Sequence, residues 1–222
     1  TGRRDNLARH ADRITFIEGG VEDPEVCRRA CDGVSEIFHL ASRVSVVESV
    51  ASPVLYREVV LGGTRNMLRA AEAAGARRLV LASSCSVYGD ATPPISEAAR
   101  LDPQSPYAAM KAEAEQACRE AEISTVCPRF FNVYGPNEFH KNRMASVVLH
   151  TFRQVQSTGG MKLFRSHRED YQDGHQTRDF VHVEDVCSVL LHFMHHRELT
   201  WEPTATRAQR LAACLRARWR SR

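Results

Sequence analysis

The sequence predicts an α/β protein in which a doubly wound parallel sheet is covered by helices on both faces. Short apolar runs rich in β-branched residues alternate with stretches of helical periodicity along most of the chain. Small polar residues follow several of these runs, at the carboxyl ends of the expected strands. Parallel sheets bind ligands at that edge, so the order of the elements predicts both the fold and the location of a site.

The alternation defines the expected elements in order. Strands are expected at residues 13–19, 36–42, 78–84, 124–130 and 179–183. Helical patterns occupy residues 24–31, 105–121, 141–156 and 184–197, and a long helical region interrupted near Pro53 continues through residues 67–74. Asp23 and Ser105 precede two of these helices and have side chains suited to N-terminal caps. No internal repeat is evident.

The composition is that of a globular chain with an uneven charge. The 222 residues are 43% hydrophobic and 26% charged, and no apolar run approaches the ~18–20 residues that span a bilayer. The formal net charge is +3, but residues 207–222 hold six arginines and no acid, which leaves −3 for the rest. We therefore expect neither a nucleic-acid nor a membrane partner for the folded body.

The cysteines and histidines favour neither disulfides nor a metal. The seven cysteines are odd in number, scattered, and form no C-x-x-C pair, so we expect reduced thiols in a cytoplasmic protein. They are Cys27, Cys31, Cys85, Cys118, Cys127, Cys187 and Cys214. His192, His195 and His196 have a spacing that could ligate a metal, but no acidic or cysteine partner lies nearby in the sequence. A helix face is favoured, and no metal site is expected.

A tyrosine and a lysine four residues apart give the clearest chemical signal. Tyr107 and Lys111 lie on one face of an expected helix, where the ammonium would stabilise the phenolate and lower the pKa of the phenol. Such a phenol is suited to accept a proton from a hydroxyl that loses hydride. Ser84 ends an expected strand a little over twenty residues earlier and could hydrogen-bond the same substrate oxygen.

Four motifs in order carry a resemblance to a known family. They are S-S-C-S-V-Y-G at 83–89, S-P-Y-A-A-M-K at 105–111, P-R-F-F-N-V-Y-G-P at 128–136 and R-D-F-V-H-V-E-D-V at 178–186. Together they resemble the extended short-chain dehydrogenase/reductases over about residues 5–197. The resemblance implies a Rossmann-like fold, an NAD or NADP cofactor, and a catalytic trio of Ser84, Tyr107 and Lys111, with Lys111 also contacting the nicotinamide ribose.

The resemblance also implies the cofactor-binding residues. They are Asp5, Asn6, Asp23, Leu40, Ala41, Ser42, Tyr107, Lys111 and Val133. Asp5 favours NAD because a carboxylate accepts the ribose hydroxyls, although Arg3 and Arg4 could offset this preference. The chain departs from the family pattern at Gly20, where an Asp is usual, and at Val60, where an Asn is usual.

The glycine-rich phosphate turn that opens the family does not occur before Asp5. We therefore expect the first β-α unit to be missing, and the chain as given to be poorly stable and to bind cofactor weakly. The expected domains are an NAD(P)-binding domain at 1–136, to which 178–197 return, and a partial substrate-binding region at 137–177. An irregular basic tail at 198–222 resembles nothing in the family.

Within the family, the sequence favours an epimerase. Dehydratases carry an Asp-Glu pair at the positions of Cys85 and Ser86, so we do not expect one. Residues 128–185 are similar to ADP-glycero-manno-heptose 6-epimerases of lipopolysaccharide-precursor synthesis, which implies Lys141 as a second catalytic group. The implied substrate-binding residues are Ser84, Asn132, His150, Phe164, Arg165, Ser166, His167 and Arg178. The first half is more similar to UDP-glucose 4-epimerases.

The function implied is that of an NAD(P)-dependent nucleotide-sugar epimerase. It would oxidise the sugar transiently to a ketone and re-reduce it on the other face, with Tyr107 and Lys141 as acid/base groups. The alternatives are a UDP-glucose 4-epimerase-like enzyme and a non-catalytic remnant that binds nucleotide weakly. Dimers are common in the family, so a homo-oligomer is a further expectation.

Overall fold

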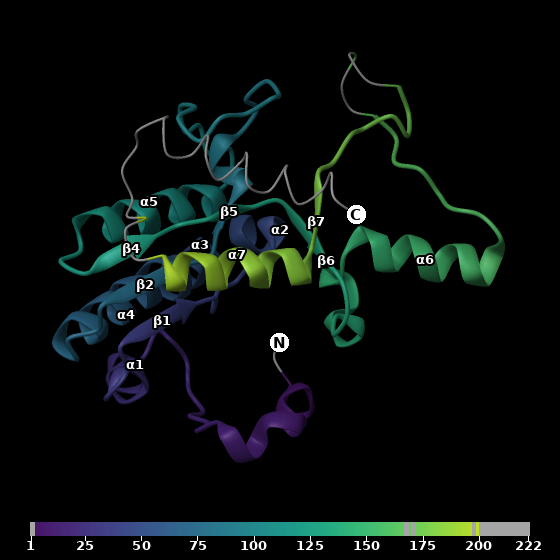
Figure 1. The fold of residues 1–222 in the computed structure, drawn as a ribbon. Coiled ribbons are helices and arrows are strands. Elements are labelled where there is room, and N and C mark those ends of the chain that lie inside the picture. The colour runs from purple at the N-terminus through teal and green to yellow at the C-terminus, as the bar shows by residue number, and fades with distance from the viewer. Residues whose placement is uncertain (1–2, 167–168, 170–171, 197–198, 200–222) are drawn as a thin grey trace. The chain divides into compact units, whose positions relative to one another are not determined.

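The computed structural model describes residues 3–166, 169, 172–196 and 199, and it has an α/β, Rossmann-like fold with parallel strands (Figure 1). The predicted fold class is confirmed. The chain forms two compact units, which we call unit 1 (residues 1–18 and 130–192) and unit 2 (residues 19–129 and 193–222). Their boundaries differ from the predicted domain boundaries, which stay a prediction. His167, Cys214 and nearly all of the basic tail lie outside the described residues.

Unit 2 is built on a three-stranded parallel sheet with the order β1-β2-β4. The strands are β1 (Glu36–His39), β2 (Arg78–Leu81) and β4 (Ser124–Val126). All four residues of the central strand β2 are buried, and the apolar residues 79–81 are typical of a strand covered on both faces.

Three helices of unit 2 contribute to its core. They are α1 (Pro24–Cys31), α4 (Gly63–Ala73) and α5 (Pro106–Glu120). Both predicted caps are confirmed: the Asp23 carboxylate accepts a hydrogen bond from Glu25 N at 2.8 Å, and the Ser105 hydroxyl accepts one from Ala108 N at 3.2 Å. Each cap is followed by a proline in the first turn, where a missing N–H leaves no helical bond unmade.

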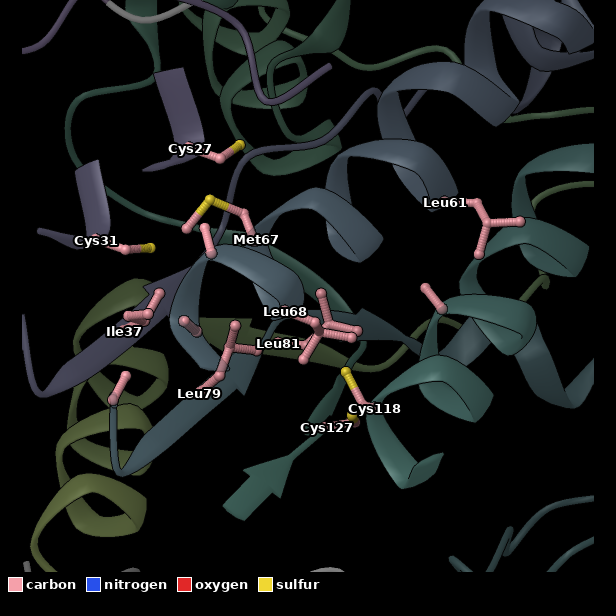
Figure 2. Packing of buried hydrophobic residues seen from close by; sticks show 14 residues of the cluster. Cys27, Cys31, Ile37, Leu61, Met67, Leu68, Leu79, Leu81, Cys118 and Cys127 are labelled. Carbon is pink, nitrogen blue, oxygen red and sulfur yellow. The ribbon is translucent and has the colours of Figure 1, made fainter. Parts of the chain in front are cut away.

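The apolar core of unit 2 contains side chains from the sheet and from these helices (Figure 2). Leu79 and Leu81 of β2 are 0% and 1% exposed, and they share the core with Leu68 of α4. Cys118 of α5 faces Cys127, the residue after β4, in the same core. Burial of such side chains is the main source of stability in a parallel sheet.

The helical region before α4 divides into short segments. It comprises α2 (Val46–Ala51), α3 (Pro53–Tyr56) and a π-helix, η2 (Arg57–Gly62). The break near Pro53 was predicted, but the π-helix was not. Val60 is 2% exposed and packs in a buried cluster with Tyr56, Tyr107 and Met110. An apolar contact against Tyr107 therefore occupies the position where the family usually has an Asn.

The first predicted strand is wrong. Residues 4–13 form a 3-10 helix, η1 (Arg4–Arg13), and residues 14–19 join no sheet. Ile14 and Phe16 are 43% and 48% exposed. A strand needs the backbone groups of a neighbour, and in the described part of the chain no strand pairs with this segment.

Two other predicted strands are each divided into two shorter ones, and the strand predicted at 36–42 ends at His39. The run at 78–84 divides at Ala82 into β2 and β3 (Ser83–Ser84). The run at 124–130 divides into β4 and β5 (Arg129–Phe130). Pro128 lies in that second break, and its lack of an N–H interrupts a ladder. The Pro128 carbonyl instead accepts a hydrogen bond from Ser83 N at 2.9 Å.

Unit 1 contains two parallel strands and two helices. The strands are β6 (Asn132–Tyr134) and β7 (Phe180–His182), and the helices are α6 (Val147–Thr158) and most of α7 (Val183–His195). The predicted helix at 141–156 begins late, because Asn142 has a φ of 49° and Ser146 caps α6 instead. Residues before that cap form a 3-10 helix, η4 (Phe139–Met144).

A buried arginine joins β2 to the carboxyl end of α7 within unit 2. Arg78 is 1% exposed and donates hydrogen bonds to the carbonyls of Phe193, His196 (2.8 Å) and Leu199 (2.6 Å). Its guanidinium also donates to Ser124 Oγ at 3.1 and 3.2 Å. The last carbonyls of a helix lack intrahelical partners, and a cation there is favourable.

Candidate active site

Unit 2 brings together the three residues predicted to form the catalytic trio. Tyr107 lies in the first turn of α5, Lys111 lies one turn later, and Ser84 ends β3. Tyr107 and Lys111 are 7% and 3% exposed. The hydroxyl of Ser84 lies close enough to the phenol of Tyr107 to lower its pKa. A phenol, a hydroxyl and an ammonium therefore converge beyond the carboxyl end of β2.

The start of α5 is held by α2. Tyr107 N donates a hydrogen bond of 3.2 Å to Ser49 Oγ, and Ser49 Oγ in turn donates to Val46 O at 2.6 Å. Ser49 is 0% exposed. This contact fixes the first turn of α5, and with it the position of the phenol.

Ser84 is oriented by the turn that follows it. Ser86 Oγ and Ser86 N lie 2.9 and 3.2 Å from Ser84 Oγ, and both donate to it. The turn forms η3 (Cys85–Tyr88) and ends at Gly89, whose φ is 60°. A Cβ at position 89 would overlap the carbonyl oxygen of Asp102, so only glycine fits this turn.

Lys111 is a buried cation attached to the strand end. Its Nζ donates a hydrogen bond of 2.8 Å to the carbonyl of Ala82. Burial lowers the pKa of Lys111 to about 8, and Cys127, Glu115 and Cys118 act in the opposite direction. The ammonium is therefore the main form at neutral pH, but its proton is held much less tightly than on an exposed lysine.

The pKa of Tyr107 moves in the direction opposite to the prediction. Burial raises the pKa of the phenol, the hydrogen bond with Ser84 lowers it, and Cys85 and Tyr56 raise it further. The predicted decrease is wrong for this structure because desolvation of the phenolate outweighs the stabilisation that its surroundings provide.

His39 was not among the predicted catalytic residues, although it ends the strand beside them. Burial, and then the charge of Lys111, lower the pKa of His39 to about 4, so the imidazole is neutral at pH 7. Thr64 Oγ1 donates its one hydrogen to Val60 O at 2.7 Å. His39 Nε2 lies 3.2 Å from Thr64 Oγ1 and must therefore donate to it, so the imidazole carries its proton on Nε2.

The predicted cofactor residues of unit 2 lie at the edge of the sheet where dinucleotides bind. Leu40, Ala41 and Ser42 follow the carboxyl end of β1, and Leu40 is 53% exposed. In the described part of the chain, Lys111 uses one of its three N–H donors on Ala82. An exposed residue after β1 and the remaining N–H donors of Lys111 are groups that a dinucleotide can contact. Asp23 is exposed and caps α1.

The other predicted site residues belong to unit 1. Asp5 and Asn6 lie in η1, and Val133 lies in β6 with 38% exposure. Lys141 lies in η4, where its backbone N donates to Glu138 O at 2.9 Å. Their roles stay predictions.

Glu138 holds the segment that carries Lys141. Its carboxylate accepts hydrogen bonds from Ser146 N at 2.6 Å and Ser146 Oγ at 2.8 Å. Burial acts to raise the pKa of Glu138, but the hydrogen bonds from Ser146 and Gly135 and the charge of Lys141 lower it overall. The carboxylate is therefore charged at neutral pH and joins η4 to the cap of α6.

The predicted substrate residues of unit 1 are largely exposed. Asn132 Nδ2 donates to Asp179 O at 2.9 Å, and Arg178 Nη1 donates to Thr177 O at 2.9 Å. Phe164 is 72% exposed. The remaining members are His150, which is exposed on α6, the exposed Arg165 and the half-buried Ser166.

A buried ion pair beside the trio was missed by the sequence analysis. Glu115 of α5 and Arg129 of β5 form it, and Ser83 and Tyr88 hydrogen-bond to it. The sequence contained a signal, because Glu115 follows Lys111 by four residues and so lies on the same helix face. Arg129 lies within the motif at 128–136, but the sequence assigned it no role.

No group of three or more His, Cys, Asp or Glu side chains that could hold a metal occurs among the described residues. The cysteines in the described ranges are free thiols. Among the described residues, no helix is long and apolar enough to cross a bilayer.

Comparison with known proteins identifies the family. Residues 1–205 match the family model described as the NAD dependent epimerase/dehydratase family. The chain belongs to this family. The matched residues include parts of both units.

Several members of the epimerase/dehydratase family are similar to the chain. The ADP-L-glycero-D-manno-heptose-6-epimerase of Fusobacterium nucleatum is 55% identical over 62 residues, which are 28% of this chain and 19% of the relative. A UDP-N-acetylglucosamine 4-epimerase from Methanobrevibacter ruminantium, solved with UDP-N-acetylmuramic acid, is 27% identical with a TM-score of 0.74. That match covers 86% of this chain and 61% of the solved one.

A third similar protein was solved with a cofactor. The UDP-glucose 4-epimerase of Thermus thermophilus, in complex with NAD, is 30% identical with a TM-score of 0.72. The match covers 87% of this chain and 63% of that one. The chain thus spans less than two thirds of the length of each of these three relatives.

Proposed function

We propose that the chain acts as an NAD(P)-dependent nucleotide-sugar epimerase, which oxidises a sugar hydroxyl transiently and returns hydride to the opposite face. The observation that carries the proposal is that Tyr107 and Lys111, both buried on one face of α5, meet the strand end that carries Ser84, where Lys111 Nζ donates to Ala82 O at 2.8 Å. Membership of the epimerase/dehydratase family and the solved NAD complex of a similar epimerase support the choice of cofactor.

Each member of the trio has a distinct task. Tyr107 Oη accepts the proton of the sugar hydroxyl and later gives it back, and Ser84 Oγ holds the same substrate oxygen. The ammonium of Lys111 stabilises the phenolate once it forms and donates to the nicotinamide ribose. A dinucleotide held beside Lys111 would supply the hydride acceptor and donor for the sugar carbon. Lys141 is the second acid/base group.

Burial raises the pKa of Tyr107, so little of the phenolate that accepts the sugar proton is present at neutral pH. The Ser84 hydrogen bond already lowers that pKa, which makes Ser84 an electrostatic contributor as well as an anchor. Burial of the phenol has the largest effect and raises the pKa, and Cys85 and Tyr56 raise it further. Turnover should therefore rise with pH until the ammonium of Lys111 is lost.

Two substrates are favoured by specific observations. The relative with 55% identity over 62 residues acts on an ADP-heptose, which makes ADP-glycero-manno-heptose our first choice and lipopolysaccharide-precursor synthesis the setting. The 30% identical UDP-glucose 4-epimerase supports a UDP-hexose as the second. Cys85 and Ser86 stand where dehydratases carry an acidic pair, so elimination of water is not expected.

The test is to incubate the chain with NAD⁺ or NADP⁺ and each of the two nucleotide sugars, and to follow the sugar configuration by proton NMR. We expect epimerisation of one of them, and a loss of about 10²–10⁴-fold in Tyr107→Phe with folding unchanged. The Lys141→Met variant should lose a similar factor. A folded chain that binds cofactor and epimerises neither sugar would overturn the proposal. A folded chain that binds no cofactor would favour a non-catalytic remnant.

A further inference from the structure

Three side chains of α5 hold three consecutive residues at the end of the central strand. Tyr107, Lys111 and Glu115 are spaced by four, so they lie on one face of the helix. Ser84 acts on the phenol of Tyr107, Lys111 Nζ donates to Ala82 O at 2.8 Å, and the Glu115 carboxylate accepts a short hydrogen bond from Ser83 Oγ. The first two contacts belong to the trio. The third has no assigned role.

Glu115 is a buried charge with a matched counter-ion. Its side chain is 1% exposed, and that of Arg129 is 7% exposed. Arg129 Nε and Nη2 donate to the two carboxylate oxygens at 2.9 and 2.6 Å, which is the bidentate geometry of a strong ion pair. Arg119 Nη2 lies 3.8 Å from the same carboxylate.

Arg129 extends the network to the turn that follows Ser84. Its Nη1 donates to Tyr88 Oη at 2.9 Å and to Glu97 O at 3.2 Å, and its guanidinium lies 4.7 Å from the centre of the Tyr88 ring. Ser83 precedes Ser84, and Tyr88 ends the η3 turn after it. The ion pair therefore holds the chain on both sides of Ser84.

We propose that Glu115, with Arg129 as its counter-ion, is a positioning residue: it holds the strand end so that Ser84 stays beside Tyr107, and it places a carboxylate one helical turn from the ammonium of Lys111. The inference rests on the proposed function, because it assigns Glu115 a task within that trio. Glu115 touches no reacting atom and acts through Ser83 and Lys111.

The surroundings of Lys111 single out Glu115 as the charge that matters. The titratable groups that raise the pKa of Lys111 are Cys127 after β4, and Glu115 and Cys118 on α5, whereas Lys111 in turn lowers the pKa of His39 on β1. His39 is neutral at pH 7 because its pKa is lowered to about 4. The hydrogen bond from Cys118 and burial raise the pKa of Cys127 well above its ordinary value, so this thiol stays protonated. Among the groups that raise the pKa of Lys111, Glu115 is the carboxylate and therefore the source of negative charge.

The lysine content makes a direct test practical. The chain contains three lysines, Lys111, Lys141 and Lys162. In protein labelled with ¹³C-lysine, the Cε signals can be followed through a pH titration, and Lys111→Met assigns the Lys111 signal. The matched control is Glu113→Gln, since Glu113 lies on the same helix and forms an exposed ion pair with Arg57 at 3.0 Å.

Opposite shifts are expected from the two halves of the ion pair. Glu115→Gln removes the negative charge that lies one helical turn from Lys111, so the titration midpoint of Lys111 should fall by about one pH unit. Arg129→Gln leaves the Glu115 carboxylate with the more distant Arg119 as its ion-pair partner, so the midpoint should rise. Glu113→Gln should leave the midpoint where it is. If both variants move the midpoint the same way, or neither moves it more than Glu113→Gln, the proposal is overturned. If only one of the two variants folds, its shift in midpoint relative to Glu113→Gln decides the test.

Ser83→Ala tests the positioning half without burying a charge. It removes the hydrogen bond that joins Glu115 to the strand end, and we expect kcat to fall about tenfold, with KM and the Lys111 midpoint little changed. An unchanged kcat would contradict the positioning role. If the wild-type chain epimerises no nucleotide sugar, the proposed function fails, whereas the lysine titration still decides the inference about Glu115.

Discussion

The two units treat their predicted site residues in opposite ways. In unit 2, Tyr107 and Lys111 are buried and hydrogen-bonded within one network. In unit 1, Lys141 and Arg178 are exposed, and Phe164 is 72% exposed. The chemistry of proton transfer requires a desolvated, prearranged site, whereas contacts to a sugar nucleotide require surfaces that a ligand can reach. The difference shows that two of the predicted catalytic groups are buried in unit 2, whereas the predicted substrate contacts of unit 1 lie at its surface.

The largest effect should come from breaking the buried network. Glu115→Ala leaves Arg129 charged and uncompensated in the interior, so we expect the free energy of unfolding to fall by about 3–5 kcal/mol. Arg178→Ala, in unit 1, should stay within about 0.5 kcal/mol of the wild type. Urea unfolding followed by circular dichroism measures both. Equal effects of the two variants would remove the contrast between the units.

A second effect should appear at low pH. The folded-state pKa of His39 is about 4, below its unfolded value of about 6.5, so the unfolded state binds more protons between these values. Stability should therefore fall by about 3 kcal/mol as the pH drops from 6.5 to 4. His39→Gln should remove this part of the pH dependence. His150→Gln, at an exposed position of unit 1, is the control, and a similar change in both variants would argue against the buried imidazole as its source.

The smallest effects should come from the helix caps, where the units resemble each other. Ser105 caps α5 of unit 2 through Ala108 N, and Ser146 caps α6 of unit 1 through Leu149 N at 3.1 Å. Replacing either serine by alanine should cost about 1 kcal/mol, with Ser146→Ala at the upper end because Glu138 also loses a partner. Thermal unfolding of both variants tests this. A cost of several kcal/mol for one cap alone would show that the units differ in more than their cores.

Much of unit 2 could be predicted because its signals are local. The caps Asp23 and Ser105 lie beside the helices that they start, and the apolar run at 78–84 marks a buried strand. The strand at 13–19 could not be assigned correctly from the same kind of pattern, since a strand depends on a partner that its own sequence does not contain.

The trio could be predicted from the sequence, whereas the buried ion pair beside it could not. Tyr107 and Lys111 lie on one helix face, which spacing alone predicts. The ion pair joins Glu115 to Arg129, fourteen residues further on, through a fold that brings β5 back to α5. The rise in the pKa of Tyr107 was also beyond the sequence, because it depends on how deeply α5 buries the phenol.

The central claim is that the buried trio of unit 2 belongs to a working dinucleotide site. The most direct test is calorimetric titration of NAD⁺ and NADP⁺ into the wild-type chain, Tyr107→Phe and Lys111→Met. We predict binding, weaker than nanomolar, to the wild type and to Tyr107→Phe, with an affinity at least about tenfold lower in Lys111→Met. A folded wild type that binds neither dinucleotide, or a Lys111→Met variant that binds as tightly as the wild type, would contradict the account.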